Sequence, residues 1–202
     1  MTADLTTDQD LLAKYAVDRD EQAFAELTRR HGRMVFRSCL RQLRDRQAAE
    51  DAAQAVFLIL ARKRGRVRAE GSLAGWLYKT AQQVSTCAAR SRARRARYEA
   101  NAAVHHGNQS PVGPAADPGL EHLDRELAAL PTDQRQAIVL RYLEGYGVQE
   151  AARIAGCPQG TLAWRAAQGL ERLRKRLTRR GRAWALAALS GLLEAQAREA
   201  VP

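Results

Sequence analysis

The sequence predicts an all-α protein: two small helical domains joined by a flexible linker, the second containing a helix-turn-helix, plus an extra C-terminal helix. Three observations support this prediction. Apolar residues recur at helical spacing along most of the 202 residues. One stretch, HHGNQSPVGPAADPG, lacks periodicity and is dominated by Asn, Gly, Ser and Pro. Residues 130–177 read as helix, glycine turn and long basic helix.

Charge and cysteine content narrow the class of protein. The chain carries 33 Lys plus Arg against 22 Asp plus Glu, a formal net charge of +11, which favours a polyanionic partner such as nucleic acid. Its three cysteines are far apart and odd in number, so neither a zinc site nor a disulfide framework is expected, and a reducing cytosol fits best.

No segment predicts membrane insertion, a cofactor or a metal. The N-terminus, MTADLTTDQD, is polar and acidic, and no apolar run approaches the roughly 20 residues that cross a bilayer. His105 and His106 have no carboxylate or thiol at ligand spacing. We therefore expect a soluble cytoplasmic protein with no metal and no cofactor.

In the first domain, residues 8–98, the segment AAEDAAQAVFLILARK predicts a two-sided helix. At about 100° per residue, one side carries Ala52, Ala53, Val56, Ile59 and Leu60. The opposite side carries Glu50, Asp51, Gln54, Leu58 and Ala61. This second side is either a solvated face with one stray leucine or a docking surface for a protein, and spacing leaves both open.

The helix SLAGWLYKTAQQVSTCAARSRARRAR is also two-sided. Leu77, Ala81, Val84 and Ala88 share a narrow arc, Trp76 flanks it, and the reverse side carries Lys79, Gln83, Thr86 and Arg90. A dense basic run containing Arg90 and Arg94 ends the helix. Arginine beside amide and aromatic groups is typical of a binder of unstacked bases. The alternative is a bundle helix with a solvated basic end and Trp76 in the core.

Residues 99–119 are predicted to be the flexible linker, and the second domain spans 120–181. Gly145 ends its first long helix, and Gly156-Cys157-Pro158 forms the turn before the basic helix. An apolar stripe on that helix predicts one packed side: Leu162, Ala166, Leu170, Leu173 and Leu177. Thr161, Trp164, Arg165 and Gln168 fall off the stripe, and Arg172 begins a basic tail suited to phosphates. This pattern predicts DNA binding.

The last segment, residues 182–202, predicts an amphipathic helix with a stripe of Leu186, Leu189 and Leu193. It either packs on the second domain or contacts another protein, and the sequence does not choose between them.

Taken together, the two halves resemble the extracytoplasmic-function sigma factors of bacterial RNA polymerase. AEDAAQAVFLILARK resembles the family's polymerase-binding segment. EGSLAGWLYKTAQQ is similar to its promoter-opening helix, with Trp76-Leu77-Tyr78 retained. LPTDQRQAIVLRYLEGYGVQEAARIAGCPQGTLAWR resembles its second DNA-binding domain. The resemblance implies a region 2-like domain at 8–98, a region 4-like domain at 120–181 and no catalysis.

The resemblance also implies roles for individual residues. The clamp region of the polymerase β′ subunit would be bound by Glu50, Asp51, Gln54 and Leu58. The −10 promoter element would be bound by Trp76, Lys79, Gln83, Arg90 and Arg94. The −35 element would be bound by Thr161, Trp164, Arg165, Gln168 and Arg172. An anti-sigma factor is implied as a further partner. Ala163, Trp164 and Gln168 depart from the family's usual residues, so the promoter sequence cannot be copied from a relative.

Two other classes of function stand beside this one. A polymerase-independent helix-turn-helix regulator explains the second domain but leaves the Asp51, Gln54 and Leu58 face without a role. A nucleic-acid enzyme needs clustered carboxylates for metal, and the tight acidic pair Glu50-Asp51 has no third partner near it. We therefore expect a protein that is not an enzyme.

Overall fold

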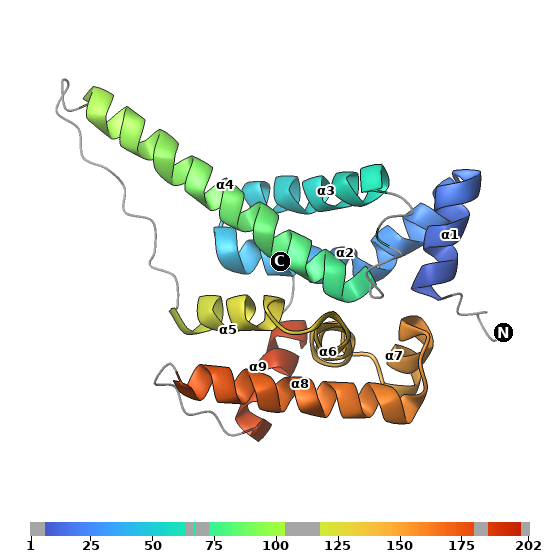
Figure 1. The fold of residues 1–202 in the computed structure, drawn as a ribbon. Coiled ribbons are helices and arrows are strands. Elements are labelled where there is room, and N and C mark those ends of the chain that lie inside the picture. The colour runs from blue at the N-terminus through green and yellow to red at the C-terminus, as the bar shows by residue number, and fades with distance from the viewer. Residues whose placement is uncertain (1–6, 64–66, 68–72, 104–117, 180–185, 199–202) are drawn as a thin grey trace.

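The computed structural model describes residues 7–63, 67, 73–103, 118–179 and 186–198, and within these residues the ordered elements are helices. This confirms the all-α prediction. The first half contains α1 (Asp8–Asp18), α2 (Glu21–Leu43), α3 (Arg46–Lys63) and α4 (Leu73–Ala103). The second half contains α5 (Pro118–Ala128), α6 (Thr132–Ile138), the π-helical turn η2 (Val139–Leu143), α7 (Val148–Ala155), α8 (Gln159–Arg179) and α9 (Leu186–Arg198). The two halves form two layers (Figure 1).

Local sequence sets the boundaries of the first helices. Asp20 caps α2, because its carboxylate accepts hydrogen bonds from the backbone N–H groups of Gln22 and Ala23 at 2.9 and 3.1 Å. Arg19 and Arg44 take left-handed conformations, with φ of 53° and 52°, and so end α1 and α2.

The core of the first layer lies where α2, α3 and α4 meet. It is filled by buried side chains from each helix, including Leu27, Val35, Cys39, Val56, Leu60, Leu77 and Tyr78. The apolar side that the sequence predicted for α3 is the side that packs here: Ala52, Val56 and Leu60 are buried.

Helix α4 is longer than the sequence suggested. It continues to Ala103, and α5 begins at Pro118, so both ends of the expected linker at 99–119 are helical. The physical reason is that the chain has no Gly or Pro between Gly75 and Gly107, and alanine favours helix at three of the positions 99–103. The far half of α4 projects beyond the rest of the first layer (Figure 1).

The second layer contains the predicted helix-turn-helix, formed by α7, the turn at Gly156 and α8. Gly156 has a φ of 65°, which ends α7 in the left-handed conformation that glycine adopts at low cost. The predicted apolar stripe of α8 faces the core, where Leu162, Leu170 and Leu173 are buried. Gly169 lets α8 approach α6 closely, since a Cβ there would lie 2.8 Å from Cδ1 of Ile138.

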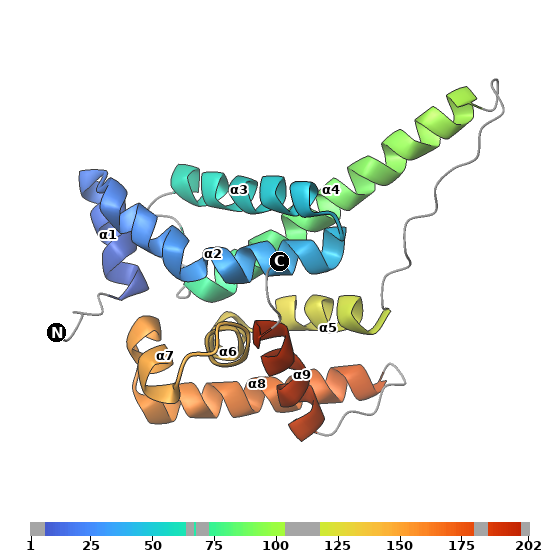
Figure 2. The ribbon, with the colours of Figure 1, turned by 180° about the vertical axis from the view of Figure 1, so that it is seen from behind.

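The C-terminal helix α9 packs on the second layer, which answers the question that the sequence left open. Leu189 and Leu193 are fully buried, and α9 contacts η2 and α8 (Figure 2). The side chain of Leu186, the third member of the predicted stripe, lies outside the described residues. Among the described helices, none is long and apolar enough to cross a membrane.

The two layers also contact each other. Helix α4 packs on α5, α6 and η2, and α2 touches α5. The two halves therefore form one closed body in this structure.

Candidate protein and nucleic-acid interfaces

The first candidate face lies on α3, on the side away from the core. Glu50, Asp51, Gln54 and Leu58 are all exposed, and the Leu58 side chain is 53% exposed. The two carboxylates are tethered along the helix: Arg46 Nε donates to Glu50 at 2.9 Å and Gln47 Nε2 donates to Asp51 at 3.3 Å. The structure therefore brings together the four residues predicted to bind a protein, with an apolar side chain in a polar setting.

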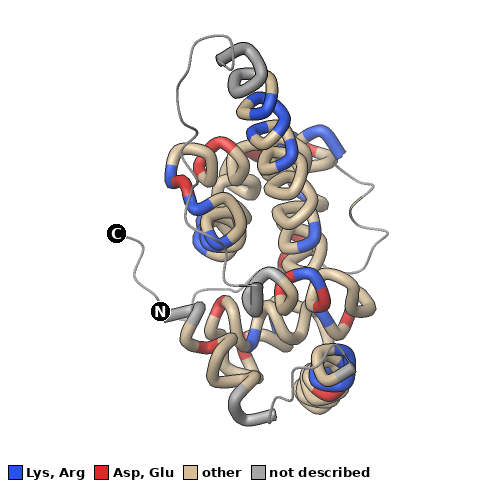
Figure 3. Tube along the Cα trace, turned by 90° about the vertical axis from the view of Figure 1, so that its left-hand side faces the viewer, with Lys and Arg blue, Asp and Glu red and all other residues tan. Residues whose placement is uncertain are grey.

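The second candidate face runs along α4. Lys79, Gln83, Arg90 and Arg94 are exposed, and at 100° per residue they fall within about 60° of one another. Figure 3 shows further Lys and Arg residues along the projecting end of this helix. Thr86, placed on the same side by the sequence, is half-buried and accepts a hydrogen bond from Gln42 of α2 at 2.7 Å.

Trp76 does not belong to this face, which corrects the expectation that it contacts DNA. Its side chain is only 5% exposed, and Lys63 Nζ lies 5.7 Å from the centroid of its ring. The reason is its position in the first turn of α4, where all six residues 73–78 are buried. Packed neighbours surround this turn, so it has no solvent side, and Trp76 is a core residue.

The third candidate face is the exposed side of α8. Trp164 is 61% exposed, and Gln168 and Arg172 are exposed beside it, while Thr161 is half-buried. Arg165, predicted with them, is held elsewhere: its Nη2 atom lies 2.9 Å from Oδ2 of Asp133 in α6. The end of α8 carries the predicted basic residues (Figure 3).

Sequence reasoning missed a polar cluster that joins the two layers. His31 of α2 is fully buried, with Nδ1 2.7 Å from Glu144 Oε1 and Nε2 3.0 Å from Asp8 Oδ2. Arg30 also bonds Asp8, at 2.7 Å. Glu144 comes from the other layer, 113 residues away in sequence, so no local pattern could have revealed the contact.

Electrostatics fix the charge state of this cluster. Burial alone would lower the pKa of His31, but the carboxylates of Glu144 and Asp8 outweigh burial and raise that pKa to about 10. The pKa of Asp8 is lowered, because His31 and Arg30 overcome its burial. Burial raises the pKa of Glu144, whose Oε2 atom is buried without a hydrogen-bond partner among the described residues. His31 is thus a cation held between two layers.

A second polar cluster centres on Asp124 of α5. Its carboxylate accepts a hydrogen bond from the Tyr78 hydroxyl at 2.6 Å and two from the Arg41 guanidinium at 3.2 Å each. Burial, followed by the Asp124 carboxylate, raises the pKa of Tyr78 well above its usual value. Arg135 of α6 adds a third link by donating to the carbonyl oxygen of Gly75 at 2.8 Å.

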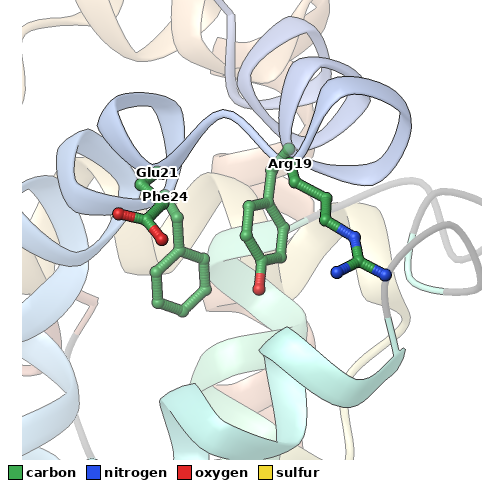
Figure 4. A pocket seen from close by; sticks show the side chains of 4 residues that line it. Arg19, Glu21 and Phe24 are labelled. Atoms are coloured by element: carbon green, nitrogen blue, oxygen red, sulfur yellow. The ribbon is translucent and has the colours of Figure 1, made fainter.

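A surface pocket lies at the junction of α1 and α2. It has a volume of about 450 Å³ and is lined by Tyr15, Arg19, Glu21 and Phe24 (Figure 4). The Tyr15 and Phe24 rings lie 4.7 Å apart, centroid to centroid. The lining places the Glu21 carboxylate and the Arg19 guanidinium beside these two aromatic rings. In the part of the chain that the structure describes, no group of three or more His, Cys, Asp or Glu residues could hold a metal ion.

Both halves of the chain match known protein families. Residues 27–95 match Sigma-70 region 2, and residues 120–173 match Sigma-70, region 4. The chain is 32% identical over 176 residues to the ECF RNA polymerase sigma factor SigM of Mycobacterium tuberculosis, covering 85% of each protein. It is 34% identical over 164 residues to the RNA polymerase sigma factor CarQ of Myxococcus xanthus, covering 79% of this chain and 92% of CarQ.

Among solved structures, the chain is similar to the sigma factor RpoE of Bartonella quintana, crystallised with the anti-sigma factor NepR. The likeness covers 80% of this chain and 98% of that one, with 22% identity and a TM-score of 0.36.

Proposed function

This chain belongs to the extracytoplasmic-function sigma factors of bacterial RNA polymerase, and we propose that its exposed faces on α3, α4 and α8 have separate roles in initiation. As a member of this family, it binds core RNA polymerase and directs promoter-specific transcription initiation. The first half (residues 8–98) binds polymerase and the −10 element, and the second half (residues 120–181) binds the −35 element. The protein acts in the cytoplasm and has no catalysis of its own.

The α3 face binds the clamp region of the β′ subunit. A leucine that is 53% exposed beside Asp51 and Gln54 offers an apolar anchor inside a polar rim, which is the usual composition of a protein interface. This arrangement supports a docking role over the alternative of a solvated face, because the packed side of α3 already fills the core.

The α4 face binds the opened −10 strand. Gln83 offers an amide that both donates and accepts hydrogen bonds, and Lys79 lies one turn before it. Arg90 and Arg94 continue the same side toward the projecting end, where they are placed to bind backbone phosphates. Trp76 supports this face from the core and makes no contact with DNA.

The α8 face binds the −35 element as a duplex. Trp164 and Gln168 extend from the side opposite the packed stripe, as a recognition helix in the major groove requires. Arg172 is exposed at the start of the basic tail and binds phosphate. Arg165 acts through Asp133 and holds α8 on α6, so we assign it a positioning role.

The observation that carries the polymerase assignment is the exposed Leu58 on α3. We test it with purified protein and sigma-free core polymerase on a pooled genomic template, mapping transcript starts. Leu58→Asp and Asp51→Arg should abolish discrete starts and co-elution with the core enzyme. Val17→Asp is the matched control, because Val17 is also an exposed aliphatic residue, 76% exposed on α1, and should leave both unchanged.

The competing function is a helix-turn-helix regulator that works without polymerase. It would leave DNA affinity intact in the Leu58→Asp variant and would show neither starts nor co-elution in the wild type. That result would refute the polymerase-binding role of α3. The family resemblance also implies an anti-sigma factor as a restraining partner.

A further inference from the structure

We propose that the recognition face of α8 reads A·T base pairs, with Trp164 and Gln168 as the residues that determine specificity. This proposal rests on the proposed −35 role of α8 and names the base chemistry that α8 selects. It follows from which side chains on this face are available to DNA and which are already engaged within the protein.

Trp164 lies at the centre of the exposed face. The buried residues of α8, Leu162, Ala166, Leu170 and Leu173, define the packed side. At 100° per residue, Trp164 points almost directly away from the middle of that side, and Gln168 follows on the next turn. The indole is 61% exposed, and neither side chain has a hydrogen-bond partner among the residues that the structure describes.

On residues 159–171 of α8, the residue type that reads guanine is already engaged within the protein. Guanine presents two acceptors in the major groove, and Arg or Lys binds them. Between Gln159 and Glu171 the only Lys or Arg is Arg165. Its guanidinium is engaged by Asp133 at 2.9 Å, and its side chain is only 26% exposed.

The residue type that reads cytosine is engaged as well. Cytosine presents an amino donor in the major groove, and a carboxylate accepts from it. The single carboxylate on this stretch of α8 is Glu171. It accepts two hydrogen bonds from Arg174, at 2.8 and 2.9 Å, and lies 3.6 Å from Lys175 Nζ. On residues 159–171, both usual readers of G·C pairs are thus engaged in ion pairs within the protein.

The side chains that remain match adenine and thymine. The Gln168 amide has one donor group and one acceptor, the complement of N6 and N7 of adenine. The Trp164 ring offers a broad apolar surface for the thymine methyl group. Arg172, one turn beyond Gln168, supplies phosphate binding without base preference.

The test is promoter selection with the complete holoenzyme. Core polymerase and the full-length protein transcribe a template library whose upstream element is randomised, and the transcribed templates are sequenced. Wild type should enrich A·T pairs at two or more adjacent upstream positions. Gln168→Arg should shift one of these toward G·C by about 5- to 150-fold, the range for one bidentate base contact. Trp164→Ala should flatten a neighbouring position, and Trp164→Leu, which keeps an apolar contact, should flatten it less.

Arg165→Ala is the control variant: loss of its contact with Asp133 should lower the transcript yield, but the enriched bases should be unchanged. Wild-type enrichment of G·C at the positions that respond to Gln168 or Trp164 substitutions would overturn the readout while initiation itself stands. Loss of a G·C preference in Arg165→Ala would do the same, because Arg165 would then be the reader. Transcripts with no upstream preference would also overturn the readout, and an absence of wild-type transcripts would overturn the proposed function with it.

Discussion

Replacing His31 by alanine tests the buried link between the two halves of the chain. The imidazolium lies 2.7 Å from Glu144 Oε1 and 3.0 Å from Asp8 Oδ2, and it is fully buried. Asp8 keeps Arg30 as a second cation at 2.7 Å when His31 is removed. Among the described residues, His31 is the one ion-pair partner of Glu144, so removing His31 would leave this carboxylate buried without a direct partner.

The expected loss of stability follows from this difference between Asp8 and Glu144. Removing one partner of a buried ion pair lowers the free energy of unfolding by about 3–5 kcal/mol. Part of that loss is the cavity left by the ring, so the pairwise contribution needs a double-mutant cycle of His31→Ala and Glu144→Ala. We expect a coupling free energy of about 1–3 kcal/mol at pH 7, the upper part of the range for contacting residues.

Urea unfolding followed by far-UV circular dichroism gives the free energies of unfolding of the wild type, the two single variants and the double variant. The exposed pair Arg46 and Glu50, with side chains 59% and 46% exposed, provides a matched control within one helix. Its cycle should give at most about 0.5 kcal/mol. If the His31 cycle gives no more than the control cycle, the buried contact between the halves does not exist in solution.

The same cycle should depend on pH in a defined direction. The folded-state pKa of His31, about 10, lies above its ordinary value of 6.5. Its contribution to stability is therefore fully present below pH 6.5 and is lost as the pH rises toward 10. Asp8 has a lowered pKa, so its contribution is present above its ordinary value of 3.8 and is lost on acidification. A coupling that grows from pH 7 to pH 10 would contradict the charge state assigned to His31.

Three further predictions concern the core. Gly169→Ala should lower the free energy of unfolding in urea by up to about 2 kcal/mol. Its Cβ would lie 2.8 Å from Cδ1 of Ile138 and 3.3 Å from the backbone oxygen of Gln134, which costs about 1–3 kcal/mol, and the higher helix propensity of alanine returns about 1 kcal/mol. Gly160→Ala meets nothing within 4 Å and should not destabilise. Trp76→Ala should lower the free energy of unfolding by about 3–5 kcal/mol, and a variant of unchanged stability with a promoter-opening defect would contradict its burial. Tyr78→Phe should cost about 1–3 kcal/mol, since the carboxylate on α5 loses a 2.6 Å hydrogen bond, and an unchanged unfolding midpoint would contradict that bond.

Periodicity predicted the exposed sides of α3 and α8 well, because each helix packs on one side only. Of the apolar side predicted for α3, Ala52, Val56 and Leu60 are buried and Ala53 and Ile59 are half-buried, whereas Leu58 on the opposite side is exposed. The same reasoning placed Trp76 wrongly, because the first turn of α4 is enclosed on all sides, and a helical wheel cannot count neighbours. It also assigned Arg165 to DNA, since its partner Asp133 lies 32 positions earlier and on another helix.

Helical periodicity could not predict the contacts between the two halves either, because their partners lie on different elements far apart in the sequence. His31 and Glu144 are 113 residues apart, and neither His31 within α2 nor Glu144 just after η2 belongs to a local pattern that indicates the contact. Asp124 sits in a leucine-rich segment whose pattern predicts packing but not a hydrogen bond to Tyr78, 46 residues away. Only the assembled fold makes these pairs visible.

With its two halves in contact, the protein is too small to span the two promoter elements. Elements named for positions −10 and −35 lie about 25 base pairs apart, roughly 85 Å along B-DNA. A compact chain of 202 residues has a radius of gyration of about 17 Å, so it is roughly 45 Å across. Under the proposed roles, α4 and α8 cannot both sit on one promoter until the links through Glu144, Asp124 and Arg135 have parted. The apparent affinity for core polymerase is then reduced by the free energy needed to separate the two halves. A substitution that weakens any of these links should therefore increase the apparent affinity.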